Sequence, residues 1–124
     1  MTFAVIDDDH DRMDEFSKQL FSAFRGIIVY LYMLPLETTA FLQERQVDAV
    51  FIEAAMEEKE GTQVLFELRE RDQELPVFIL ADNDEYEAAA MWNDATDYLI
   101  RPVFEEKLRE VITKNLLNLG ERIS

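Results

Sequence analysis

Short apolar runs alternate along the chain with longer segments whose apolar residues recur at helical spacing. The apolar runs lie at 3–6, 27–34, 49–52, 76–80 and 98–100, and their length and β-branched or aromatic content predict five strands. Helical spacing predicts helices between Asp9 and Gly26, at 37–45, from Gly61 onward, at 84–93 and after Pro102. The chain is therefore expected to alternate strand and helix from end to end.

Two of these helices carry an apolar stripe that identifies the side facing the rest of the protein. In the first helix the expected inward residues are Met13, Phe16, Leu20 and Phe24, with Asp9 or Asp11 near the N-terminus. In the last helix the expected inward residues are Phe104, Leu108, Val111, Ile112 and Leu116.

Five strands alternating with five helices predict one parallel sheet covered by helices on both faces. The strands read as continuous apolar runs, which is typical of strands buried on both faces. Right-handed crossovers and the small size favour a doubly wound, flavodoxin-like α/β fold with the strand order 2-1-3-4-5. The whole chain, 1–124, is expected to form a single domain.

The charge balance narrows the range of partners. Twelve Lys and Arg residues stand against 27 Asp and Glu, a formal net charge of −15. Such a domain repels phosphate backbones and anionic lipid, so direct contact with nucleic acid or a membrane is not expected. The chain has no cysteine, which fits a cytoplasmic protein, and it has one histidine and no glycine-rich phosphate loop. A free-standing enzyme is therefore not expected.

Polar side chains follow the predicted strands where each strand ends. Asp7 and Asp8 follow the first strand and Glu53 follows the third, while Ala81 and Asp82 follow the fourth and Arg101 follows the fifth. Ligands of open α/β sheets bind at this carboxyl edge, where we expect these residues to meet. Clustered carboxylates repel one another, and hard oxygen ligands suit magnesium. The pattern favours weak Mg²⁺ binding by Asp7, Asp8 and Glu53; alternatively, these acids only cap strand ends and face water.

Four motifs in order give the chain a resemblance to the CheY-like response regulator receiver domain. They are the acidic turn at 5–9, the strand and loop at 48–61, the Pro-Val strand at 76–80 and the segment Asp97-Tyr98-Leu99-Ile100-Arg101-Pro102. The resemblance covers nearly the whole chain and implies a role in two-component signal transduction or a phosphorelay. It also implies that Tyr98 is the switch aromatic and that the Arg101–Pro102 bond is a candidate cis peptide.

The departures from the receiver pattern predict a degenerate phosphorylation pocket. Glu53 stands where the resemblance places the phosphoacceptor aspartate, and its extra methylene displaces the nucleophile by about 1.5 Å. Ala81 lacks the hydroxyl expected after the fourth strand, and Arg101 replaces a lysine. Asp82 and the acidic loop at 57–60 add negative charge that repels an anionic phosphodonor. These changes together predict that phosphotransfer is lost.

The remaining groups suggest a fixed state. Glu53 can place negative charge where a phosphoryl group would lie, with Arg101 as its expected partner. Without a hydroxyl at position 81, an inward Tyr98 meets less steric resistance, so we expect a domain locked near the active-like arrangement. Alternatively, Tyr98 is a partly exposed aromatic residue with no switching role.

The leading hypothesis is a phosphorylation-independent pseudo-receiver that acts by protein–protein contact. The resemblance implies a contact face formed by the helix at 84–93, the strand at 98–100 and the helix after Pro102, used by a homodimer or another protein. Within this face, Trp92 is expected to pack in the core. One alternative is an unusual but phosphorylatable receiver, and another is a receiver-like accessory domain of a larger enzyme such as a pyridoxal-dependent amino-acid decarboxylase.

Overall fold

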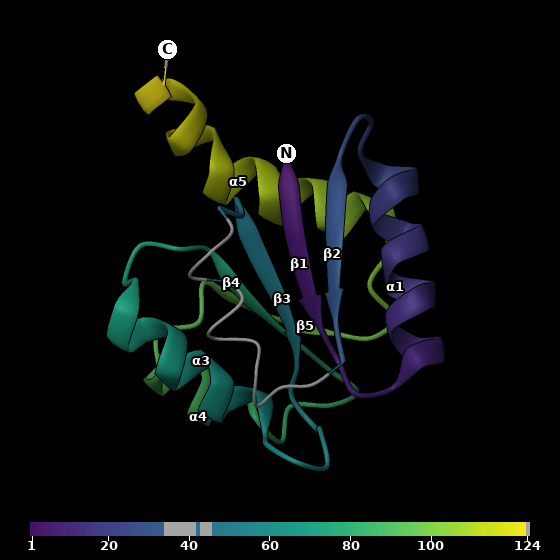
Figure 1. Ribbon diagram of the computed structural model, residues 1–124, viewed down its shortest axis with the longest axis vertical. Helices are drawn as coiled ribbons and strands as arrows, with labels where there is room; N and C mark the ends of the chain where they lie inside the picture. The colour runs from purple at the N-terminus through teal and green to yellow at the C-terminus, as the bar shows by residue number, and fades with distance from the viewer. Residues whose placement is uncertain (34–41, 43–45, 124) are drawn as a thin grey trace.

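The computed structural model describes the backbone of residues 1–33, 42 and 46–123, and side-chain environments as far as residue 116 (Figure 1). The strands are β1 (Thr2–Ile6), β2 (Ile28–Tyr32), β3 (Ala49–Glu53), β4 (Val77–Ala81) and β5 (Asp97–Ile100). The helices are α1 (His10–Ala23), α3 (Gly61–Arg71), α4 (Glu87–Trp92) and α5 (Glu105–Ile123). The helix predicted at 37–45 lies outside the described residues, apart from Leu42.

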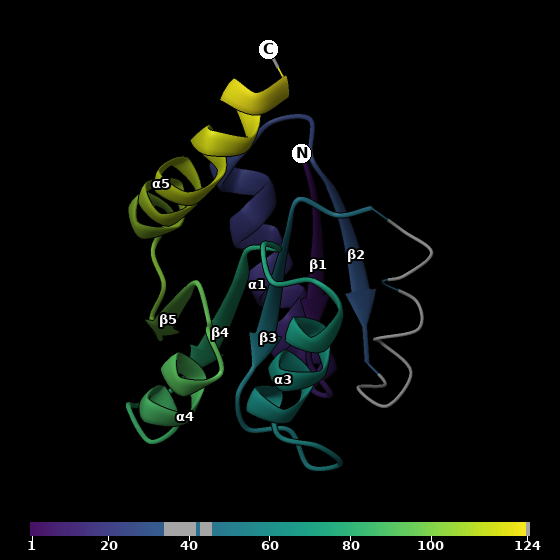
Figure 2. The same ribbon diagram turned by 90° about the vertical axis from the view of Figure 1, so that its left-hand side faces the viewer.

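The five strands form one parallel sheet in the order β2-β1-β3-β4-β5, which confirms the predicted fold class. Helices α1 and α5 pack together over one face of the sheet, and α3 and α4 lie over the other (Figures 1 and 2). The register sets Ile6 beside Ile52 and Ala81 beside Ile100. The carboxyl ends of β1, β3, β4 and β5 therefore meet at one edge.

The strand side chains alternate between two hydrophobic cores, one on each face of the sheet. Under α1 and α5, Phe51 packs against Phe3, Phe16 and Phe78 with ring centroids 5.0–5.7 Å apart, a spacing that favours edge-to-face and offset contacts. Under α3 and α4 the core is mainly aliphatic and contains Ile6, Ile52, Ile79, Val64 and Leu65. Both faces of β1, β3 and β4 are buried, as the continuous apolar runs predicted.

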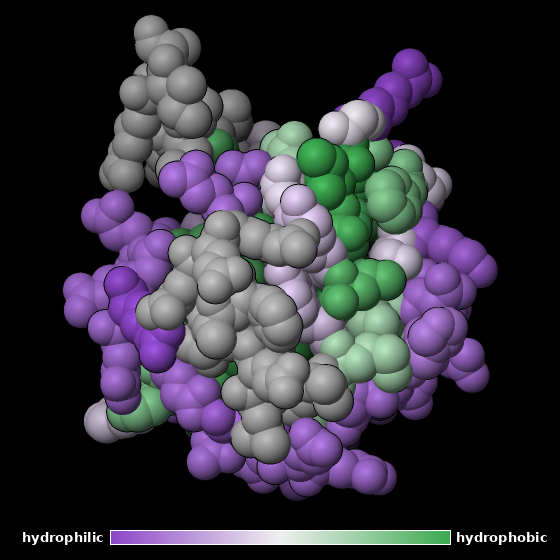
Figure 3. Space-filling model, in the orientation of Figure 1, coloured by the Kyte–Doolittle hydropathy of each residue, from purple (hydrophilic) through white to green (hydrophobic). Residues whose placement is uncertain are grey.

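Strand β2 departs from that expectation because it lies at the edge of the sheet. Its run is as apolar as the others, yet Ile28 and Leu31 are exposed and every other residue of the strand is only partly buried. Apolar side chains gather over β2 on an otherwise largely polar face (Figure 3). In the part of the chain that the structure describes, no helix is long and apolar enough to span a bilayer.

The helix ends refine the expected boundaries. The Asp9 carboxylate caps α1 by accepting a hydrogen bond from the Arg12 backbone N–H at 3.0 Å, as one of the two predicted caps. Helix α1 ends at Ala23, and Gly26 then turns the chain with a positive φ of 66°. Helix α4 spans only Glu87–Trp92, shorter than the predicted 84–93, because the chain turns through 84–86 before the helix starts.

Two inward assignments were wrong. Phe104 is 66% exposed because it precedes the first turn of α5, whereas Leu108, Val111, Ile112 and Leu116 are buried as predicted. Trp92 is 87% exposed at the end of α4, not packed in the core. Both aromatic residues are therefore surface features.

Gly61 is required where α3 approaches the end of β3. Its N–H donates a 2.9 Å hydrogen bond to the carbonyl oxygen of Ala54, and a Cβ atom on Gly61 would lie 2.2 Å from the carbonyl oxygen of Glu53. No side chain can occupy that space without a shift of the β3 backbone. The glycine thus fixes α3 against the residue that carries the central carboxylate.

We predict that Gly61→Ala lowers the free energy of unfolding by about 1–3 kcal/mol, because the added methyl group overpacks a backbone contact. Urea denaturation followed by circular dichroism measures the change. Gln63→Ala, at an exposed position of the same helix, is the matched control and should change stability by less than about 0.5 kcal/mol. Equal stability of Gly61→Ala and the control would show that α3 does not sit this close to β3.

Candidate functional site

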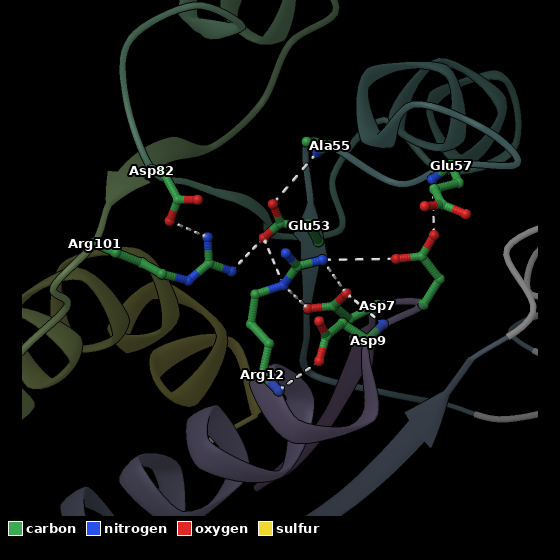
Figure 4. A network of polar contacts seen from close by, with 9 residues as sticks. Asp7, Asp9, Arg12, Glu53, Ala55, Glu57, Asp82 and Arg101 are labelled. Atoms are coloured by element: carbon green, nitrogen blue, oxygen red, sulfur yellow. Dashed lines mark hydrogen bonds and ion pairs between the residues drawn. The ribbon is translucent and has the colours of Figure 1, made fainter.

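The predicted site residues meet at the carboxyl edge of the sheet. Asp7 directly follows β1, Glu53 ends β3, Ala81 ends β4 and Arg101 directly follows β5. Backbone hydrogen bonds hold these ends in place, among them Ala54 N–H to the Leu80 carbonyl at 2.9 Å and Arg101 N–H to the Ala81 carbonyl at 2.8 Å. The edge is therefore a rigid frame for a small set of charged side chains (Figure 4).

Arg12 occupies the middle of this set, and the sequence analysis missed it. Its guanidinium group makes a bidentate contact with Asp7, with Nε 2.8 Å from Oδ2 and Nη2 2.6 Å from Oδ1. The same group lies 3.6 Å from an Asp8 oxygen and 3.7 Å from an oxygen of Glu53. Figure 4 shows the guanidinium group between Asp7 and Glu53. One side chain thus contacts all three predicted metal ligands.

The start of α1 directs Arg12 into the pocket. The chain turns tightly after β1, where the Asp9 N–H donates a 3.0 Å hydrogen bond to Asp7 Oδ1. The hydrogen bond that Asp9 accepts from the Arg12 N–H lowers the pKa of Asp9 and fixes the first helical turn. Arg12 therefore leaves the helix on the side of the strand ends, while Met13 faces the core.

Glu53 is held by a second guanidinium group. Its side chain is buried, and the residue is only 1% exposed. Its Oε2 accepts a hydrogen bond from Nη2 of Arg101, and Nη1 of the same arginine lies 3.2 Å from Asp82. The other oxygen, Oε1, is 3.4 Å from the N–H of Ala55. The structure thus brings Glu53 and Arg101 together, and exposed Asp82 joins them from the rim.

Asp8 lies farther out and connects the pocket to the loop after β3. Its Oδ2 accepts a 2.7 Å hydrogen bond from the N–H of Glu57, in the acidic loop between β3 and α3. The Asp8 side chain is also less buried than that of Asp7. Its main role in this structure is to hold the loop between β3 and α3.

Electrostatics account for this arrangement. Asp7 is 2% exposed, and an unpaired carboxylate at such a position would be strongly destabilising. The hydrogen bonds with Asp7 raise the pKa of Arg12 further above its ordinary value, with a smaller contribution from the charge of Glu53. The guanidinium groups of Arg12 and Arg101 thus offset two of the three negative charges carried by Asp7, Asp8 and Glu53.

The three predicted magnesium ligands are engaged by Arg12 in this structure. Among the described residues, no three acidic or histidine side chains are placed so that they could hold a metal. Asp7, Asp8 and Glu53 do converge, but both oxygens of Asp7 already accept hydrogen bonds from Arg12. Mg²⁺ needs near-octahedral oxygen ligands at about 2.0–2.1 Å. The guanidinium group occupies the space beside the carboxylate oxygens that would supply these ligands. In this structure Asp7, Asp8 and Glu53 are thus partners of Arg12.

Tyr98 lies inward beside this pocket. It is buried, its hydroxyl group donates a 2.6 Å hydrogen bond to the Asn83 carbonyl, and the same oxygen lies 3.3 Å from the N–H of Tyr86. Burial raises the pKa of Tyr98. Ala81, at the end of the neighbouring strand, is also buried and offers no hydroxyl group.

The Arg101–Pro102 peptide bond is cis.

Comparison with known proteins places this geometry in a family. A family model described as "Response regulator receiver domain" matches residues 3–113. The probable C4-dicarboxylate response regulator DctR of Bacillus subtilis is 26% identical over 113 residues, which cover 89% of this chain and 50% of that protein. The chain thus spans about half the length of the curated relative it matches.

Solved structures show the same fold. A response regulator receiver domain from Clostridium thermocellum has a TM-score of 0.83 and 24% identity, covering 99% of this chain and 98% of its own. The receiver domain of a Pseudomonas aeruginosa sensor histidine kinase, with magnesium in its active-site cleft, has a TM-score of 0.82 and 16% identity. That likeness covers 93% of this chain and 96% of the other. At these identities the neighbours establish the fold.

We predict that Arg12→Ala lowers the free energy of unfolding by about 3 kcal/mol, because it leaves Asp7 buried with no positive partner. Chemical denaturation in EDTA, followed by circular dichroism, measures the loss. The matched control is Arg25→Ala, which removes the same charge from an exposed turn and should cost less than about 0.5 kcal/mol. Equal losses in the two variants would mean that Arg12 does not neutralise Asp7.

Proposed function

Because the chain belongs to the response regulator receiver family, we propose that it is a phosphorylation-independent pseudo-receiver. Receiver domains are signalling modules of two-component systems, and in this proposal the domain signals by protein–protein contact without a phosphorylation cycle. The observation that supports this proposal most strongly is the environment of the Glu53 side chain. Its carboxylate contacts the guanidinium groups of Arg101 and Arg12 at once and is almost completely buried.

A carboxylate in that position is a poor phosphoacceptor. Nucleophilic attack needs an oxygen held in line with the phosphodonor, and Glu53 Oε2 is directed toward Arg101. The side chain is also one methylene longer than aspartate, so its oxygens lie farther from the β3 backbone. Two cations on one carboxylate stabilise its charge and reduce its nucleophilicity.

The surroundings also disfavour an anionic donor. Ala81 provides no hydroxyl group to bind a phosphoryl oxygen. The carboxylate of Asp82 forms an ion pair with Nη1 of Arg101. The loop after β3 presents Glu57 and Glu58 to solvent, while Lys59 of that loop is paired with Glu67 of α3. A phosphodonor approaching this rim therefore meets mainly negative charge.

The same contacts support a domain held in one state. The Glu53–Arg101 pair places a neutralised carboxylate at the centre of the pocket, and Tyr98 is inward with its hydroxyl group bonded to Asn83. In the proposed function this combination corresponds to a permanently active-like arrangement. No covalent modification is needed to reach it.

Exposed apolar side chains support the proposed contact face. Met91 and Trp92 of α4, Ile100 of β5 and Phe104 just before α5 are all exposed. Helix α4, strand β5 and the segment that enters α5 are the elements of the α4-β5-α5 face, and exposed apolar side chains that include tryptophan are typical of protein interfaces. We propose that a second copy of the chain, or another cytoplasmic protein, binds here. The net charge of −15 disfavours nucleic acid and membrane surfaces as partners.

We predict that incubation with acetyl phosphate and Mg²⁺ leaves the intact mass unchanged. Phosphorylation would add about 80 Da, which mass spectrometry of the intact protein resolves. A phosphorylatable receiver with aspartate at the acceptor position serves as the positive control in the same mixture. An adduct on this chain, mapped to Glu53 or to any other carboxylate, would instead make it an unusual phosphorylatable receiver.

We also predict that the α4-β5-α5 face mediates self-association. Sedimentation equilibrium should show a monomer–dimer equilibrium, and Trp92→Ala or Phe104→Ala should raise its dissociation constant by about tenfold or more. Phe21→Ala, at an exposed position of α1, is the matched control and should leave the constant unchanged. A dimer that is insensitive to both face variants would place the interface elsewhere, and a monomer at all concentrations would exclude the homodimer.

A further inference from the structure

We propose that Arg12 takes the place of a divalent cation in this pocket, so that the acidic site receives its cation from within the chain and is closed to magnesium. This inference deepens the proposed function, on which it rests, by naming what makes the pocket independent of external ions. It concerns the ligand chemistry of Asp7, Asp8 and Glu53, the three acids that meet at the strand ends.

The position of the guanidinium group carries the inference. Its Nε and Nη2 atoms engage both oxygens of Asp7 at 2.8 and 2.6 Å, and the same two nitrogens lie 3.7 Å from Glu53 and 3.6 Å from Asp8. A cation bound by these three carboxylates would need to sit among the same oxygens. The space between the three carboxylates is thus filled by the guanidinium group of Arg12, which already contacts all three.

Arg12 is not a loose surface side chain that could readily yield. Its backbone N–H is tied to the Asp9 cap at 3.0 Å, and its side chain is only 27% exposed. The planar fork of the guanidinium group matches a carboxylate in two hydrogen bonds, which a spherical ion cannot imitate without releasing the fork. A magnesium ion would therefore need to expel Arg12 and break both hydrogen bonds to Asp7.

A single positive group also leaves the pocket with less positive charge than a metal would provide. Arg12 and Arg101 together balance two of the three carboxylates, so the site keeps a net negative charge that repels an anionic phosphodonor. The pocket is fixed by bonds within the chain. Its state then does not vary with the concentration of magnesium.

The test is calorimetric titration of the purified chain with MgCl₂ in the absence of any phosphodonor. The wild-type chain should show no saturable binding below about 10 mM, whereas Arg12→Ala should gain a site at least about tenfold tighter. Arg25→Ala changes the net charge equally at an exposed position and should behave as the wild type does. Arg12→Lys, which keeps the positive charge, should also gain no site.

A second variant locates the gained site. Adding Asp7→Asn to Arg12→Ala should abolish the binding. The second substitution removes the carboxylate to which the cation would bind in place of Arg12. If Arg12→Ala is unfolded in EDTA, magnesium should restore its circular dichroism spectrum, and failure to restore it would contradict the inference. Saturable millimolar binding by the wild-type chain, or no gain in Arg12→Ala, would overturn it.

These outcomes separate the inference from the proposed function. A phosphoryl adduct on a chain that binds no magnesium would defeat the pseudo-receiver proposal and leave the role of Arg12 intact. Magnesium binding by a chain that gains no adduct would defeat the role of Arg12 alone.

Discussion

The structure at the carboxyl edge of the sheet depends on how two buried carboxylates are neutralised. Asp7 follows β1 and Glu53 ends β3, and adjacent parallel strands bring them to one place with almost no exposure to water. Carboxylates so close repel each other unless positive charge lies between them. In this chain the positive charge comes from Arg12 and Arg101, each fixed by the element that carries it.

This solution couples the pocket to the rest of the fold. Arg12 is part of the first turn of α1, Arg101 follows β5 at a cis peptide bond, and Asp8 holds the loop that leads to α3. The charged network thus connects elements from both faces of the sheet. A pocket built in this way is part of the folded structure itself, which is the physical basis of the proposed phosphorylation-independent state.

Much of this could be predicted from the sequence, because strand order and strand ends determine where side chains meet. The alternating apolar runs predicted the sheet, and the residues that follow each run placed Asp7, Glu53 and Arg101 together.

Arg12 was missed because it lies on the polar side of an amphipathic helix, where exposed charge is the ordinary expectation. A signal was present: a basic residue three positions after the Asp9 cap lies in the first helical turn, directly above the acidic strand end. Phe104 and Trp92 were misplaced because an apolar residue at a helix end can face either the core or a partner, and periodicity does not distinguish the two.

The most direct measurement is a high-resolution crystal structure of the chain grown with millimolar magnesium. Our account predicts the Arg12 guanidinium group bidentate on Asp7, within hydrogen-bonding distance, with no ion among Asp7, Asp8 and Glu53. A magnesium ion coordinated by these acids, with Arg12 turned out to solvent, would contradict it.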